Sequence, residues 1–286
     1  MGAKSIDAAE FRDKQRDQWN GAAVGWNEWS EYMDGHTGGV AERLVEMAGV
    51  KEGDRVLDVA AGYGEPSLTA ARRVGPQGSV IATDISAEML NFGRERAAAN
   101  GVENIEFMQA DASSLDFPAE SFDAAVSRWG IIFEPDGEGG AAKVRGFLKP
   151  GSRFGISSWG PPERVPFLAI AMKTAMQKLD IAPPPPGTPG PLSRPTEEAI
   201  GGLLEGGGFS DVEVEELEVA FQFDSADEYT RFTRAIAAPI IAMISPHPED
   251  VQRDTWQAIT DAIAEREDSD GRVSLANQVL VAAGQA

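Results

Sequence analysis

Two glycines follow a short apolar run in the first third of the chain. The segment VLDVAAGYGE contains them as Gly62 and Gly64, and it leads into a stretch with helical spacing. Glycines at a strand-to-helix turn let a ligand approach the backbone closely, and the helix that follows offers free N–H groups and a positive dipole end. Such a pair also occurs in tight turns that bind nothing, so it indicates a ligand site only together with other residues.

An acidic residue ends the next apolar run. Asp84, in the segment ATDIS, would lie at the carboxyl end of the second strand, where a carboxylate can accept hydrogen bonds from ribose hydroxyls. A dinucleotide site would need a third glycine for the pyrophosphate, and Ser67 stands in that position. Asp111, in the segment ADA, favours a cationic nucleoside without phosphate. Asp58, inside the first strand, is expected to support the glycine turn.

These residues need a parallel sheet to bring them together. Short apolar runs alternate with helix-period segments from Gly53 to Trp159, which is typical of a doubly wound α/β domain. Ser86 is expected to cap a helix that Gly101 ends. The pattern predicts strands at 55–61, 79–85, 105–111, 122–128 and 153–159, with helices at 65–74, 86–100 and 137–147.

The rest of the chain changes character. A Trp-rich leader precedes an amphipathic helix predicted at 39–49, and the Pro-rich segment IAPPPPGTPGPLSRP cannot form a helix. A strand is predicted at 211–223 and another at the end of the chain. We expect an N-terminal cap segment at 1–38, a core at 39–159, a Pro-rich insert at 160–194, a continuation of the core at 195–224, a helical lid insert at 225–270 and a final core strand at 271–286.

Composition narrows the range of partners. The chain has 25 Lys and Arg against 46 Asp and Glu, and the net charge of −21 disfavours nucleic acid and anionic lipid. We assign this acidity to a solvated surface, as in a salt-adapted organism, rather than to the substrate. The absence of Cys excludes disulfides and thiol nucleophiles, and the two His residues give little reason to expect a metal.

No apolar run approaches the ~20 residues of a membrane span, and the charged start lacks the apolar block of a signal peptide. We therefore expect a cytoplasmic protein with no nucleic-acid partner, no membrane insertion and no metal. The sequence leaves open whether the chain forms a homo-oligomer.

Five segments, in order, resemble the class I S-adenosylmethionine-dependent methyltransferases, in the branch of the ubiquinone/menaquinone C-methyltransferases and related small-molecule enzymes. The resemblance covers about residues 40–160 and, by architecture, 195–223. It implies a mostly parallel, seven-stranded Rossmann-like sheet with helical cap insertions. Ala60 departs from the pattern, since the family often has Gly there. The matching segments are VLDVAAGYG, TDIS, QADA at 109–112, SFDAAVSRWG at 121–130 and LKPG at 148–151.

The resemblance implies S-adenosylmethionine as the cofactor and assigns roles to residues near the strand ends. Asp84 would accept hydrogen bonds from the ribose hydroxyls, and Ile85 would pack on adenine. Asp111 and the Ala112 N–H would meet the amino edge of adenine. Ser127 would hold the methionyl ammonium through its backbone carbonyl. The residues implied to bind the cofactor are Ala60, Gly62, Gly64, Asp84, Ile85, Asp111, Ala112 and Ser127.

Acceptor contacts are expected from the segments outside the core. The resemblance places Trp129 and Phe133, just past the fourth strand, near the transferred methyl group. Trp29 and Tyr32 of the leader are further candidates. Other aromatic and Met residues of the leader and inserts could line an apolar pocket, although each alone is more typical of a core. They are Trp26, Met33, Phe167, Met172, Met176, Phe232 and Met243.

A general base is needed only if the acceptor must lose a proton. His36 is the one histidine near a cleft segment and is the candidate base, with an exposed loop histidine as the alternative. His247, between two prolines, is expected to be a turn residue.

The predicted activity is transfer of a methyl group to a small, largely apolar or neutral molecule at C, O or N. A dry pocket that aligns nucleophile, methyl and sulfur would supply much of the rate. The alternatives are a non-catalytic nucleoside-binding protein of the same fold and an NAD-dependent oxidoreductase.

Overall fold

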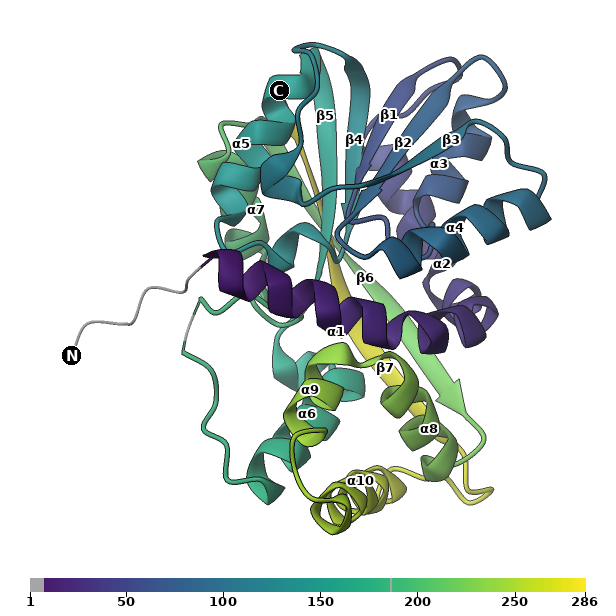
Figure 1. Cartoon of the computed structure of the whole chain (residues 1–286), viewed down its shortest axis with the longest axis vertical. Coiled ribbons are helices and arrows are strands. Elements are labelled where there is room, and N and C mark those ends of the chain that lie inside the picture. The colour runs from purple at the N-terminus through teal and green to yellow at the C-terminus, as the bar shows by residue number, and fades with distance from the viewer. Residues whose placement is uncertain (1–7, 186) are drawn as a thin grey trace.

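The computed structural model describes residues 8–185 and 187–286. Its centre is one sheet of seven strands in the order β3-β2-β1-β4-β5-β7-β6 (Figure 1). The first five strands are parallel, and β7 runs antiparallel to both of its neighbours. This is the doubly wound α/β fold that the sequence predicts. The strands are β1 (Arg55–Val59), β2 (Ser79–Asp84), β3 (Ile105–Gln109), β4 (Phe122–Arg128), β5 (Leu148–Trp159), β6 (Ser210–Phe223) and β7 (Val273–Gln285).

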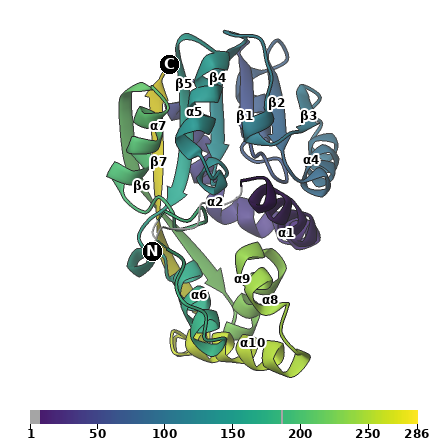
Figure 2. The same cartoon turned by 60° about the vertical axis from the view of Figure 1, so that its left-hand side comes forward.

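Helices cover both faces of the sheet, because successive strand side chains point to opposite sides. Val56 belongs to an apolar cluster with residues of α2, α3 and α4, whereas Leu57 belongs to a second cluster with residues of α5 and α7. Figure 2 shows the two layers on either side of the strands. The covering helices are α2 (Ser30–Met47), α3 (Ser67–Val74) and α4 (Ala87–Ala99) on one face, and α5 (Gly137–Phe147) and α7 (Glu197–Gly206) on the other.

The predicted ends of α4 are confirmed. The Ser86 side chain accepts a hydrogen bond from the Met89 N–H at 3.1 Å, which caps the helix. Gly101 follows the last turn with φ of +65°, a left-handed conformation that glycine adopts without strain. The helix therefore starts at a fixed point beside the carboxyl end of β2.

The leader is helical throughout its described part. It forms α1 (Ala8–Glu28) and then α2, and Gly38 and Gly39 lie inside α2. The predicted boundary between 38 and 39 is therefore wrong, because it would divide one continuous helix that packs on β4 and β5. Figure 1 shows α1 running across the molecule between the sheet and a group of helices below it.

That group of helices forms a cap. Residues from the predicted Pro-rich insert and from the predicted lid pack together, with α6 against α9 and α10. The Tyr229 hydroxyl donates to the Phe167 carbonyl at 2.7 Å, and the Asn277 side chain of β7 accepts from the Phe167 N–H at 2.9 Å. The cap is thus tied to the long strands β6 and β7. Its helices are α6 (Pro166–Lys178), α8 (Ala226–Ile236), α9 (Ala238–Ile244) and α10 (Glu249–Ala264).

Three short 3-10 helices lie in the loops that follow strands. They are η1 (Ala112–Ser114), η2 (Ile131–Phe133) and η3 (Pro162–Arg164). Within residues 8–185 and 187–286, no helix has both the length and the apolar character needed to cross a bilayer. The cellular location, the oligomeric state and the absence of nucleic-acid binding stay predictions.

Candidate active site

The turn after β1 is held in a left-handed conformation at three residues, Ala60, Gly62 and Gly64. A side chain added at Gly62 would meet nothing within 4 Å, so this glycine leaves open space beside the turn. A side chain added at Gly64 would come within 3.4 Å of Gly93 in α4. Gly62 therefore gives room for a ligand, whereas Gly64 is favoured by its φ of +107°, which residues with a side chain rarely adopt. Ala60, at φ of +59°, carries backbone strain of the kind that clusters at functional sites.

Asp84 is fixed beside this turn by two backbone hydrogen bonds. Its Oδ2 accepts from the Gly62 N–H at 2.8 Å, and its Oδ1 accepts from the Ser86 N–H at 2.7 Å. Burial raises the pKa of Asp84 to about 6, and the hydrogen bonds from Ser86 and Gly62 limit the rise. Near neutral pH the carboxylate is thus charged, oriented and able to accept further hydrogen bonds.

Asp58 supports the same turn, as predicted. It is fully buried, and its Oδ2 accepts from the Ser67 hydroxyl at 2.5 Å at the start of α3. Burial raises the pKa of Asp58 to about 7, an effect that the Ser67 hydrogen bond and the positive charge of Arg128 oppose. Its Oδ1 has no hydrogen-bond partner among the described residues.

Asp111 follows β3, and α1 lies against it. The Asp111 Oδ1 accepts from the N–H and hydroxyl of Ser113, and its Oδ2 forms an ion pair with the Arg12 Nε at 2.9 Å. Arg12 also lies 3.9 Å from Glu134. Burial raises the pKa of Glu134 to about 7, and the charge of Asp111 adds to the rise. An acidic edge, closed by one arginine of α1, therefore borders this part of the site.

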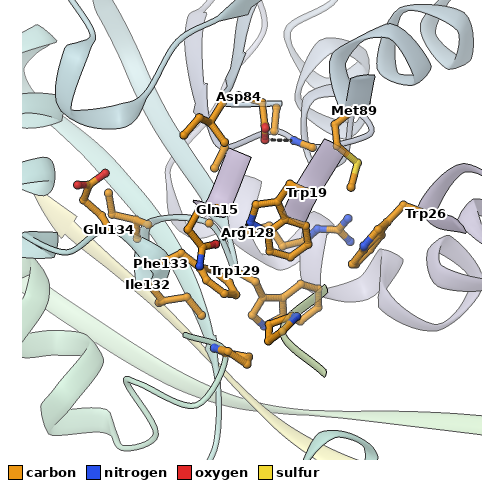
Figure 3. Close-up of a pocket in the computed structure, with 18 of the residues that line it drawn as sticks. Gln15, Trp19, Trp26, Asp84, Met89, Arg128, Trp129, Ile132, Phe133 and Glu134 are labelled. Atoms are coloured by element: carbon orange, nitrogen blue, oxygen red, sulfur yellow. Dashed lines mark hydrogen bonds between the residues drawn. The ribbon is translucent and has the colours of Figure 1, made fainter. Parts of the chain in front are cut away.

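These groups share one cavity at the carboxyl ends of β1 to β4 (Figure 3). We call its part beside the glycine turn and the ends of β2 and β3 the motif side. The residues of the motif side are Ala60, Ala61, Gly62, Asp84, Ile85, Met89, Ala110, Asp111 and Ala112. Six of the eight residues predicted to bind the cofactor are among them, all except Gly64 and Ser127.

The opposite part of the cavity, which we call the aromatic side, comes from α1, α2, the ends of β4 and β5, and the cap. The rings of Trp129 and Trp159 stack with their centroids 4.6 Å apart and their planes 6° apart. The Trp129 indole N–H has no partner in the described part of the chain. The residues of the aromatic side are Trp26, Met33, Trp129, Trp159, Phe167, Leu168, Met172, Pro191, Ile236 and Ile240.

Helix α1 spans both sides of the cavity. The Trp19 ring meets Phe133 edge to face at a centroid distance of 5.4 Å, and the Trp26 indole donates to the Ile236 carbonyl at 3.0 Å. In Figure 3, Trp19 lies centrally, between Asp84 and Trp129. Phe133 and Trp129 thus line the cavity, and their contact with an acceptor stays a prediction. Sequence reasoning did not single out Arg12 or Trp19, because nothing in a polar helix shows which sheet edge it crosses.

Ser127 is placed differently from the expectation. Its hydroxyl donates to the Val59 carbonyl at 2.7 Å and accepts from the Ile131 N–H at 3.0 Å, and the residue does not line the cavity. Its side chain joins the ends of β1 and β4. The residue after it, Arg128, does line the cavity. The SRWG segment, at the end of a predicted strand, was the available signal for this arginine.

The leader residues Trp29, Tyr32 and His36 do not line the cavity, which corrects their prediction as catalytic or acceptor-binding residues. Trp29 directly precedes α2, and Tyr32 and His36 lie on a face of α2 that is turned toward β6 and α8. The His36 Nδ1 lies 2.8 Å from the Tyr32 carbonyl, and the imidazole ring packs on Tyr32 and Phe221. The neighbouring face of α2 presents Met33 to the cavity instead. Helical register, which decides this, was not evident because α2 was predicted to begin only at residue 39.

Tyr32 and Trp29 belong to the aromatic core of the cap. The Tyr32 hydroxyl donates to the Gln222 carbonyl at 2.8 Å, and Trp29 packs edge to face on Phe232 at 5.1 Å. Met176, Phe232 and Met243 also lie outside the cavity lining, whereas Trp26, Met33, Phe167 and Met172 are part of it.

Comparison with known protein families finds a match over the part of the chain that contains the glycine turn and the predicted cofactor residues. Residues 40–174 match the ubiE/COQ5 methyltransferase family. The match covers just under half of this chain. The family resemblance that the five segments indicated is thereby confirmed. The matched residues include the glycine turn, Asp84, Asp111 and the loop after β4.

A curated relative is the ubiquinone/menaquinone biosynthesis C-methyltransferase UbiE of Pseudomonas fluorescens, 32% identical over 164 residues. The match covers 57% of this chain and 64% of that enzyme's length. Among solved structures, the YcgJ protein of Bacillus subtilis is 20% identical with a TM-score of 0.54, covering 86% of this chain and 97% of its own. The [4+2]-cyclase SpnF is 18% identical with a TM-score of 0.53, covering 86% and 80%. Both support the Rossmann-like methyltransferase fold.

Proposed function

We propose that the protein transfers the methyl group of S-adenosylmethionine to a small, largely apolar or neutral molecule and releases S-adenosylhomocysteine. The observation that carries the proposal is that one cavity joins the motif side to an aromatic wall of different origin. The family match of residues 40–174 supports the cofactor.

The motif side fits this cofactor. The buried Asp84 carboxylate lines the cavity and can accept from two ribose hydroxyls, and the missing side chain of Gly62 leaves the space that the methionyl part needs. Ile85 offers an apolar surface for adenine, and Asp111 offers an acceptor for its amino group. The bound cofactor would supply a methyl group already activated by the positive sulfur.

The aromatic side favours a neutral acceptor with apolar surface. Its walls are indole, phenyl and aliphatic groups, and such walls bury an apolar ring or chain at about 25 cal/mol per Å². The guanidinium carbon of Arg128 lies 5.2 Å from the Trp129 ring centre, so a fixed positive charge borders this space. Among the described residues, the aromatic side has no carboxylate that could offset the charge of a cationic acceptor.

Positioning supplies the catalytic effect in this proposal. Among the described residues, no imidazole lines the cavity. The carboxylates that line it lie outside the aromatic side; they are Glu65, Asp84, Asp111 and Glu134. An in-line transfer gains much from holding the two reactants in alignment, up to about 7–11 kcal/mol of the barrier. The stacked indoles of Trp129 and Trp159 and helix α1 would hold the acceptor and exclude water.

The fold alone leaves the reaction open, since the [4+2]-cyclase SpnF shares it. The test is therefore calorimetric binding of S-adenosylhomocysteine and NAD⁺, followed by formation of S-adenosylhomocysteine from S-adenosylmethionine with a panel of apolar phenols, quinols and neutral amines. We expect the protein to bind S-adenosylhomocysteine but not NAD⁺, and to methylate some of the acceptors in the panel. Binding without turnover on any acceptor would favour a non-catalytic or differently catalytic protein, and binding of NAD⁺ alone would overturn the proposal.

A further inference from the structure

Arg128 is a buried cation at the carboxyl end of β4. Only 7% of its surface is exposed, and its guanidinium donates to the Thr37 hydroxyl at 2.9 Å and to the Tyr63 hydroxyl at 3.1 Å. Both partners are neutral. A buried guanidinium is normally paired with an anion, because taking an uncompensated charge out of water is costly.

The nearby carboxylates are engaged elsewhere. Within residues 8–185 and 187–286, no ion pair within 4.0 Å includes Arg128, and the Asp34 carboxylate pairs with Arg96. Asp34 also accepts from the Tyr63 hydroxyl at 3.0 Å, and Glu65 accepts from the Thr69 hydroxyl at 2.8 Å. These acids act on Arg128 only at longer range.

Arg128 also faces the cavity, next to the glycine turn. It lines the space together with Tyr63, the residue after Gly62, and its guanidinium carbon lies 5.8 Å from the Tyr63 ring centre. The one other cation that lines the described cavity is Arg12, which is paired with Asp111. Arg128 is therefore the lining cation without an anionic partner, and it lies between the motif side and the aromatic side (Figure 3).

We propose that Arg128 binds the carboxylate of the methionyl part of S-adenosylmethionine, an inference that rests on the proposed function. This carboxylate is the negative group of the cofactor, and the methionyl part is expected beside Gly62, next to Tyr63. A guanidinium can hold a carboxylate with two parallel hydrogen bonds, which fixes direction as well as distance. Holding that end would aim the sulfur-bound methyl group toward the Trp129–Trp159 stack.

The experiment compares two ligands that differ in the amino-acid part. S-adenosylhomocysteine has the carboxylate, and 5′-methylthioadenosine keeps the adenosine and thioether without it. Calorimetric affinities for both are measured on the wild type, Arg128→Met, Arg128→Lys and Arg96→Met. Arg96 serves as the matched control because it belongs to the same network through Asp34 and Tyr63 but does not line the cavity.

We expect Arg128→Met to bind S-adenosylhomocysteine about 10- to 100-fold more weakly, as for loss of a charge-assisted hydrogen bond, with methylthioadenosine affinity little changed. Arg128→Lys should keep part of the preference, and Arg96→Met should leave the ratio of the two affinities as in the wild type. Decarboxylated S-adenosylhomocysteine, which keeps the amino group, should bind wild type and Arg128→Met equally.

Two results would overturn the inference alone. Equal weakening of both ligands in Arg128→Met would make the arginine a structural support of the turn. Unchanged S-adenosylhomocysteine binding, with lost turnover of carboxylate-bearing acceptors, would assign Arg128 to the acceptor instead. If the wild-type protein bound neither ligand, the proposed function itself would be contradicted, and not only the role of Arg128.

Discussion

The motif side and the aromatic side of the cavity are built in opposite ways. The motif side comes from three consecutive strand ends between Ala60 and Ala112, each with its functional residue within a few positions of a β-strand. The aromatic side collects residues from elements that are far apart in the chain, namely α1, α2, the loop after β4, β5, α6, the segment before α7, α8 and α9. Local backbone geometry therefore fixes the first side, and tertiary packing of the cap fixes the second.

This difference explains what the sequence could predict. Asp84 and Ser86 follow from a strand end and a helix cap, both of which depend on neighbouring residues. The same reasoning failed for Tyr32 and His36, because their direction depends on the register of α2 against β6. No pattern in the leader distinguishes the face of α2 that carries Met33 from the face that carries His36.

The sequence also identified the cap segments without showing that they form one unit. The Pro-rich insert and the lid insert were separate predictions, yet α6 packs on α9 and α10. Such contacts between distant segments are decided by burial of apolar faces, which a single sequence does not pair. Arg128 was missed for a related reason. Its lack of an anionic partner is evident only once the contacts of the neighbouring carboxylates are known, and these contacts are tertiary.

The largest expected effect is on the motif side, at Gly62. Substitution with Val would place a branched side chain at φ of +55° and fill the open space beside the turn. We expect S-adenosylhomocysteine affinity to fall by about 100-fold, since overpacking a filled site costs about 1–3 kcal/mol. The measurement is calorimetry with purified variants.

Gly101→Val is the matched control for Gly62→Val. Gly101 has φ of +65° and open space around it, but it ends α4 away from the cavity. It should lose stability through the same backbone strain, about 1–2 kcal/mol, and keep its affinity. Equal loss of affinity in both variants would mean that strain, and not the ligand space at Gly62, governs binding.

The second effect is smaller and depends on pH. Asp84→Asn keeps a hydrogen-bond acceptor but removes the charge, so we expect about 10-fold weaker S-adenosylhomocysteine binding at pH 7.5. Because the pKa of Asp84 is about 6 in the folded protein, wild-type affinity should fall as the pH drops below about 6. The variant should show no such fall.

Asp123→Asn provides the control, because Asp123 lies at the opposite end of β4 and pairs with Lys149. Its S-adenosylhomocysteine affinity should match that of the wild type at both pH values. A wild-type affinity that stays constant from pH 7.5 to pH 5 would show that the Asp84 charge does not contribute to ribose binding.

On the aromatic side, Trp129→Phe should separate acceptor from cofactor. A phenyl ring keeps part of the stack on Trp159 but removes the indole N–H. We expect the acceptor KM to rise roughly 3- to 10-fold with S-adenosylhomocysteine affinity unchanged, in line with the ~0.5–1.5 kcal/mol of an aromatic pair. Trp256→Phe, in α10 outside this cavity, should change neither. Parallel losses of both affinities in Trp129→Phe would contradict the division into two sides.

The last expected effect concerns stability and not ligand binding. The pKa of Asp58 is about 7 in the folded protein and about 3.9 in an unfolded chain. Between these values the folded state keeps a proton that the unfolded state releases, so the free energy of unfolding should decline as the pH rises from about 4 to 7 and then level off. Asp58→Asn should flatten this part of the curve, as followed by urea unfolding. A variant with the wild-type slope would assign the slope to other groups, such as Glu134.

The central claim is that one cavity brings an activated methyl group to an apolar acceptor. The direct measurement is mass spectrometry of a small-molecule cell extract incubated with the protein and S-adenosylmethionine bearing a trideuterated methyl group. The account predicts a neutral, apolar compound that gains the labelled methyl with wild-type protein and does not with Gly62→Val. The claim would be contradicted if the label were found only on a strongly cationic compound. It would also be contradicted if no compound were labelled although S-adenosylhomocysteine binds tightly.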